Sequence, residues 1–95
     1  MAIDKSDLAK EITCRSFKVS KYKADTKVNK RLDDLDEQAA MEAFLNVRVP
    51  DWLLAHYPTW GWIVIHAHEF EGIGTMGDFC ELVAKHLTAS PGGQP

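Results

Sequence analysis

The sequence predicts a mostly α-helical protein, a small four-helix bundle with room for a short two-stranded β pairing. The chain has 95 residues, which is the length of one ordinary domain and too short for two independent cores. Its composition, 45% hydrophobic and 26% charged, is typical of a globular protein. Apolar residues recur at helical spacing along much of the chain. We therefore expect one helical domain over residues 1–88 and a disordered C-terminal tail over residues 89–95.

The first helix is expected from about Asp4 to Ser16. Asp4 or Ser6 can cap it, because their side-chain oxygens accept from free N–H groups of the first turn. Leu8 and Ile12 lie one turn apart on its buried side.

Residues 17–32 are expected to form a long loop. Phe17 and Tyr22 lie among lysines without a helical period, so this stretch reads as a loop or a short extended piece. Val28 and Leu32 are the expected anchors of the loop to the core.

The second helix is expected from Asp34 to about Leu45, and a short third helix from Pro50 to Tyr57. The acidic residues 33–37 favour a helix start, because carboxylates complement the free N–H groups and the dipole there. Proline suits the first turn of a helix but not its interior. The sequence therefore predicts a break before Pro50.

Residues 60–70 allow two interpretations. The run Trp62–Ile65 is aromatic and β-branched, which favours a strand. A strand needs a partner, and the stretch 17–22 is the only plausible one. A helix through Phe70 is the alternative.

The last helix has the clearest signals. Gly72 and Gly74 break the chain before it, Thr75 can cap it, and Asp78 completes a capping box. Its apolar stripe at helical spacing consists of Met76, Phe79, Cys80, Val83 and Leu87.

The apolar runs and the first residues bear on localisation. The longest apolar run, Trp62–Ile65, is far shorter than the roughly 20 residues that a membrane helix needs. Charged residues follow Met1 where a secretory signal would be apolar. We expect a cytoplasmic protein without a membrane segment, in which Cys14 and Cys80 are reduced thiols.

Charge is divided unevenly along the chain. Residues 1–32 carry nine basic and four acidic side chains, a balance of +5, whereas residues 33–95 carry two and ten, a balance of −8. The basic segment 18–31 could contact phosphates, so a nucleic-acid-associated factor is one alternative function. It contains a single aromatic residue, Tyr22, which is fewer than a base-stacking surface needs. A solvated loop facing the acidic segment is the competing interpretation.

His66 and His68 are the strongest candidates for metal ligands. On a strand, residues two apart share a face, so both imidazoles could reach one ion. A third ligand would have to come from His56, His86 or Cys80. A small metal-binding protein is thus a second alternative, set against a pair of surface histidines. The favoured prediction contains no metal site and no cofactor.

The spacing of the residues provides neither a nucleophile–base pair nor a closed set of metal ligands, so we expect no enzyme activity. Cys80 and His86 are six residues apart, which places them on different faces of the last helix.

Trp52, Trp60 and Trp62 lie within eleven residues of one another, where they serve either as core residues or as a groove for an apolar partner. Trp60 is expected to be the most exposed.

The order of these elements resembles the acyl carrier protein family. Asp34-Leu35-Asp36 is similar to the family's Asp-Ser-Leu-Asp signature, Val49-Pro50-Asp51 to the segment leaving its second helix, and Ile73-Gly74-Thr75 to the start of its last helix. The family's serine carries a phosphopantetheine arm. Here Asp34 precedes Leu35 directly, and no serine or threonine lies between Val28 and Pro58. The resemblance implies a carrier-like fold that has lost its attachment site.

The function predicted from the sequence is a non-catalytic protein-interaction module. In the acyl carrier proteins the acidic second helix meets partner enzymes, which implies a partner with a basic surface here. Charge would steer the encounter and an exposed tryptophan would add affinity. The predicted partner-binding residues are Asp33, Asp34, Asp36, Glu37 and Trp60.

Overall fold

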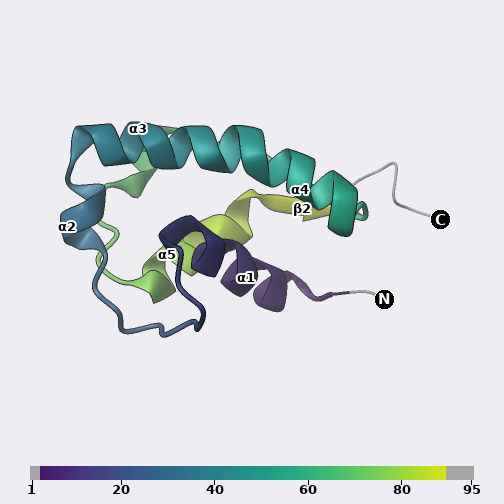
Figure 1. The fold of residues 1–95 in the computed structure, drawn as a ribbon, viewed down its shortest axis with the longest axis horizontal. Helices are drawn as coiled ribbons and strands as arrows, with labels where there is room; N and C mark the ends of the chain where they lie inside the picture. Colours follow the sequence, from purple (N-terminus) through teal and green to yellow (C-terminus); the bar gives the residue numbers. More distant parts are fainter. Residues whose placement is uncertain (1–2, 90–95) are drawn as a thin grey trace.

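The computed structural model describes residues 3–89, and it confirms a mostly helical fold with a short two-stranded sheet. The elements are α1 (Lys5–Phe17), α2 (Asn29–Leu32), α3 (Leu35–Ala43), η1 (Phe44–Arg48), α4 (Val49–His56), β1 (Trp60–Trp62), η2 (Ala67–Phe70), α5 (Met76–His86) and β2 (Leu87–Ala89). A long helix formed by α3, η1 and α4 lies across α1 and α5, which pack on each other (Figure 1). Within the described residues, no helix combines the length and apolarity that crossing a bilayer requires.

The predicted first helix is confirmed, with Asp4 as its cap. Asp4 Oδ1 accepts a hydrogen bond of 2.8 Å from the Asp7 N–H, which satisfies a donor that has no partner within the helix. Leu8 and Ile12 are fully buried. The helix ends at Phe17 and is capped by Lys18, which adopts the left-handed conformation with φ 56°.

The predicted break before Pro50 is wrong, because α3, η1 and α4 form one continuous helix. In η1 the turn widens to a π-helix, and the Val49 N–H donates to the Phe44 carbonyl five residues earlier. Proline has no N–H to give, and the wider turn accommodates this missing donor without ending the helix. The buried stripe of the long helix consists of Met41, Leu45, Val49 and Leu53.

Residues 60–70 form neither one strand nor one helix. β1 pairs antiparallel with β2, with Trp62 opposite Leu87, and η2 follows as a 3₁₀ helix. The predicted pairing with residues 17–22 is therefore wrong, since the partner of β1 is β2, which follows α5 directly. Residue 89, expected in the tail, belongs to β2; the rest of that expected tail, residues 90–95, lies outside the described residues.

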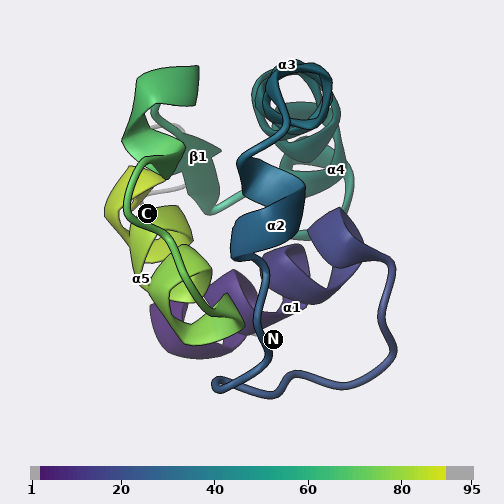
Figure 2. The ribbon, with the colours of Figure 1, turned by 90° about the vertical axis from the view of Figure 1, so that its left-hand side faces the viewer.

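The loop after α1 is fastened to the start of α5 (Figure 2). The Ala24 carbonyl accepts from the Gly77 N–H and the Thr26 carbonyl from the Met76 N–H, each over 2.9 Å. A Cβ on Gly77 would lie 3.1 Å from the Ala24 oxygen, so glycine permits this close approach. The predicted Thr75 capping box of α5 is confirmed.

Candidate functional site

A groove of about 700 Å³ runs between α1 and the η1–α4 part of the long helix. Its apolar surface consists of Ile12, Val19, Phe44, Val49 and Trp52. Phe44 and Trp52 are half-buried, so part of each ring remains open to a ligand. The volume falls within the roughly 300–1,000 Å³ that ligand sites occupy in proteins.

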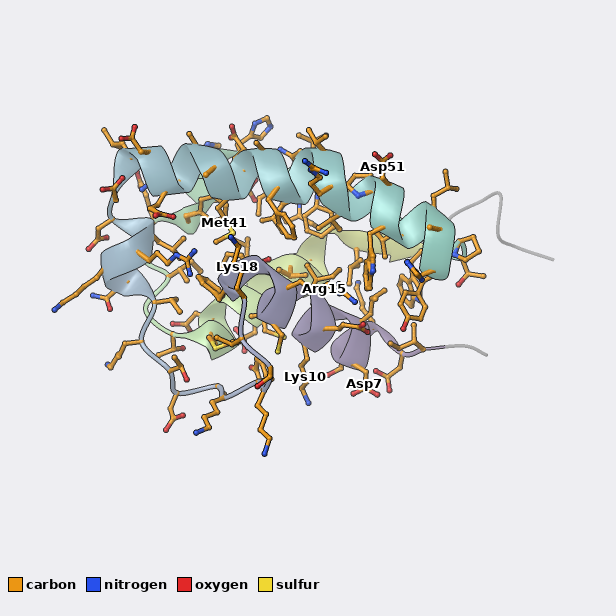
Figure 3. All side chains as sticks on the ribbon, viewed as in Figure 1. Asp7, Lys10, Arg15, Lys18, Met41 and Asp51 are labelled. Atoms are coloured by element: carbon orange, nitrogen blue, oxygen red, sulfur yellow. The ribbon has the colours of Figure 1, made fainter. Side chains whose placement is uncertain are left out.

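Among residues 3–89, three cations and no acidic side chain line this groove. Arg15 is held in place, because its guanidinium lies 3.6 Å from Glu11 and 4.7 Å from the centroid of the Trp52 ring. In the part of the chain that the structure describes, Lys18 and Arg48 take part in no ion pair. Figure 3 shows Arg15 and Lys18 on the side of α1 that faces the long helix.

Lys18 stands at one end of the groove in a strained backbone conformation. Its N–H donates to the Arg15 carbonyl over 3.3 Å and completes the cap of α1. Glycine normally occupies such left-handed caps, and another residue costs about 1–2 kcal/mol there. The cap places the Lys18 side chain and Val19, which is 41% exposed, beside the groove.

A second groove of about 350 Å³ continues the first toward α2. The two grooves share Arg15, Lys18 and Phe44, and the second adds Arg31 and Glu37. The Glu37 carboxylate lies 3.5 Å from the Arg31 Nε, so the one acid that lines this continuation is already paired. The basic character of the surface therefore extends from α4 to α2.

The structure does not gather the predicted partner-binding residues, Asp33, Asp34, Asp36, Glu37 and Trp60, on one surface. Asp34 caps α3, and its Oδ1 accepts from the N–H groups of Asp36 and Glu37 over 2.8 and 3.1 Å. Trp60 belongs to β1, at the opposite end of the long helix (Figure 1). It is half-buried, and its indole N–H donates to the Ile3 carbonyl over 3.2 Å.

His66 and His68 form a stacked surface pair where η2 begins. Their ring centroids lie 5.8 Å apart with the planes 6° from parallel, and both residues are exposed. Among residues 3–89, no group of three or more His, Cys, Asp or Glu side chains is placed to hold a metal ion.

His86, which is buried, and Glu69, which is half-buried, form a polar cluster that sequence reasoning missed. The Nδ1 and Nε2 atoms of His86 lie 2.8 Å from the Ile63 carbonyl and from Glu69 Oε1, so both ring nitrogens face acceptors. Glu69 Oε2 accepts from the His66 N–H over 2.9 Å. This bond, and then His86, hold the pKa of Glu69 below its ordinary value against the opposing effect of burial. With both nitrogens engaged, the imidazole has no free position for work as a base.

The two cysteines lie in packed surroundings. Cys14 lines the groove, and burial, followed by the nearby Cys80 and Glu11, raises the pKa of its thiol. Cys80 is buried beside Tyr22, whose pKa is raised first by burial and then by Cys80. The raised pKa of Cys14 disfavours the thiolate, which is the nucleophilic form of a cysteine.

The basic segment 18–31 lies mostly in an exposed loop, with Tyr22 as its only aromatic residue. That ring is half-buried, and Lys10 Nζ lies 5.6 Å from its centroid. Tyr22 is thus engaged with its own domain and does not form an open base-stacking surface.

Sequence reasoning also missed Arg48 and Phe44 as lining residues. The predicted break before Pro50 separated Arg48 from Trp52, which are four residues apart and share one face of the continuous helix. The spacing of Arg48 and Trp52, one helical turn apart, was the signal that could have placed both on one surface.

Comparisons with protein-family models, with curated proteins and with solved structures each gave no match. The resemblance to the acyl carrier proteins therefore stays a prediction.

Proposed function

We propose that the protein is a non-catalytic protein-interaction module that binds a partner in the groove between α1 and η1–α4. The observation that carries the proposal is the open apolar groove, with the half-buried rings of Phe44 and Trp52 on its wall. Apolar surface left open between two helices of a small domain is a common feature of interaction sites.

Trp52 has the properties of an anchor residue. Its ring packs edge-on against Tyr57, with the centroids 5.3 Å apart, and the Arg15 guanidinium covers it. Tryptophan and arginine are enriched among the residues that dominate binding energy, and a ring that is already fixed loses little entropy on binding. These contacts support a preformed binding surface.

Individual residues support three further properties that we propose: a non-catalytic role, a cytoplasmic location and the lack of a cargo arm. The raised pKa of Cys14 and the engaged ring of His86 favour binding over catalysis. The two free cysteines support a reducing, cytoplasmic setting. Asp34 precedes Leu35 without the carrier family's serine between them and serves as a helix cap, which supports a carrier-like domain without a cargo arm.

The exposed carboxylates of Asp33, Asp34 and Asp36 form a separate candidate contact for a partner with a basic surface. They lie at the far end of the long helix from Trp60 (Figure 1), so they would act without it. Asp36→Asn tests this contact and leaves the Asp34 cap in place.

Selection of a random peptide library on the purified protein tests the proposal. Selected peptides should bind with micromolar Kd, and Val19→Gln, a change inside the groove, should weaken them by roughly tenfold. Val47→Gln is the matched control, since Val47 is 60% exposed and does not line the groove. Failure to enrich any peptide, or peptides insensitive to Val19→Gln, would contradict the groove as the binding surface.

A further inference from the structure

The charge around the groove indicates what kind of partner it accepts. Resting on the proposed function, we propose that the groove binds an acidic amphipathic segment of another protein. Apolar side chains of that segment would occupy the space beside Phe44 and Trp52, and its carboxylates would meet Lys18 and Arg48.

Positive charge stands on both walls of the groove. Lys18 comes from the end of α1 and Arg48 from η1, and no acid of the described chain lines the groove between them. A carboxylate placed there gains attraction from both walls, and it does so beside apolar surface that screens charge less than water does. Lys18 and Arg48 would repel a lysine-rich segment, because like charges placed side by side disfavour association.

The neighbouring contacts leave these two cations available. Arg15 is occupied by Glu11 and Trp52, and in the second groove Arg31 is paired with Glu37. Lys18 and Arg48, by contrast, join no ion pair within residues 3–89. Of the cations that line the two grooves, Lys18 and Arg48 are therefore the ones whose charge no printed ion pair balances within the described residues.

The length of the surface favours a peptide segment over a small anion. The two grooves share three residues and together follow the long helix from Glu37 to Trp52. At 1.5 Å per residue, this stretch is about 22 Å long, which matches about four turns of a bound helix or about seven extended residues. Cations recur along the whole surface, as repeated carboxylates of a segment would require.

Two synthetic peptides and dodecanoate are the probes for the test. The peptides share leucine and phenylalanine at helical spacing and carry either glutamate or lysine at the other positions. Kd is measured by fluorescence anisotropy in about 50 mM and about 500 mM NaCl, because salt screens exposed charges. The glutamate peptide should bind roughly tenfold tighter at low salt, and the difference should shrink at high salt.

Charge reversal links the preference to the two cations. Lys18→Glu combined with Arg48→Glu should abolish or invert the preference for the glutamate peptide. Lys10→Glu combined with Lys21→Glu makes the same change in net charge outside this groove and should leave the preference unchanged. Figure 3 shows Lys10 on the side of α1 away from the long helix. Loss of the preference in this control pair as well would overturn the assignment to Lys18 and Arg48.

Further outcomes separate this inference from the proposed function. Equal or tighter binding of the lysine peptide, still weakened by Val19→Gln, would overturn the acidic partner and retain the groove as an interaction surface. Saturable binding of dodecanoate, with neither peptide bound, would replace the partner protein by a small amphipathic anion. Binding of no probe and no selected peptide would overturn both proposals together.

Discussion

The side-chain amide of Asn46 pairs with both backbone groups of Ile65. Its Nδ2 donates to the Ile65 carbonyl over 2.7 Å, and its Oδ1 accepts from the Ile65 N–H over 2.9 Å. The same oxygen accepts from the Trp62 indole N–H over 3.0 Å. Because Asn46 lies in η1, these bonds fasten the π-helical turn of the long helix to the segment that follows β1.

Asn46→Ala should lower the free energy of unfolding by about 2–4 kcal/mol, because three groups lose their partner in a partly buried site. Urea denaturation followed by circular dichroism measures the change. Asn29→Ala, at an exposed position in α2, is the control and should change stability by less than about 1 kcal/mol. Equal losses in the two variants would show that the Asn46 contacts contribute nothing specific.

Stability should fall on acidification in a way that depends on Glu69. Its pKa is below the ordinary value of 4.5, because the His66 N–H and then His86 favour the carboxylate. A depressed pKa in the folded state means that the contribution is complete above pH 4.5 and is lost as the pH falls through the lower folded value. Glu69→Gln should flatten this decline in urea denaturation between neutral and acidic pH. The exposed Glu71→Gln should keep the wild-type slope, and parallel curves for wild type and Glu69→Gln would refute the assignment.

Gly72 and Gly74 form a matched pair for backbone strain. Gly72 has φ +83° with no atom within 4 Å of an added Cβ, so Gly72→Ala should cost about 1 kcal/mol through the backbone alone. In Gly74→Ala, the new Cβ would meet Asp78 Oδ2 at an ordinary 3.7 Å. Thermal unfolding should therefore show a lower Tm for Gly72→Ala than for Gly74→Ala, and the reverse order would contradict the role given to φ.

Lys18→Gly should separate stability from binding. Glycine removes the left-handed strain of about 1–2 kcal/mol but adds freedom to the unfolded chain, for a net gain in stability of about 0.5–1 kcal/mol. The same substitution removes a cation from the groove, so the glutamate peptide should bind more weakly. Urea denaturation and anisotropy on one preparation test both parts. A more stable variant that binds as tightly as wild type would argue against a role for Lys18 in binding.

Incubation with coenzyme A and a broad-specificity phosphopantetheinyl transferase should leave the intact mass unchanged. Asp34 precedes Leu35 directly, and no serine or threonine lies between Val28 and Pro58 to accept the arm. An acyl carrier protein treated in parallel shows that the enzyme is active. A mass gain would reveal an attachment residue elsewhere and contradict the loss of carriage.

The local signals of the sequence located the ends of two helices. Asp4 caps α1, and Thr75 with Asp78 caps α5, because these hydrogen bonds join residues three apart and need no tertiary contact. The apolar stripe of α5 was predicted for the same reason, since its period belongs to the helix itself. Four predicted members, Met76, Phe79, Cys80 and Val83, are buried in α5, and the fifth, Leu87, is buried as the first residue of β2.

Local sequence signals were enough to predict the helical class, the caps of α1 and α5 and much of the core, because these depend on neighbours within one or two helical turns. The continuation of the helix through Pro50 depends on tertiary contacts: packing of the buried stripe on either side of Pro50, together with the π-turn, outweighs the local preference for a break. Tertiary structure also decided the strand pairing and the groove. Trp62 pairs with Leu87, and Lys18 and Arg48 line one groove, only after the chain has folded back on itself. No spacing in the sequence encodes such long-range neighbours.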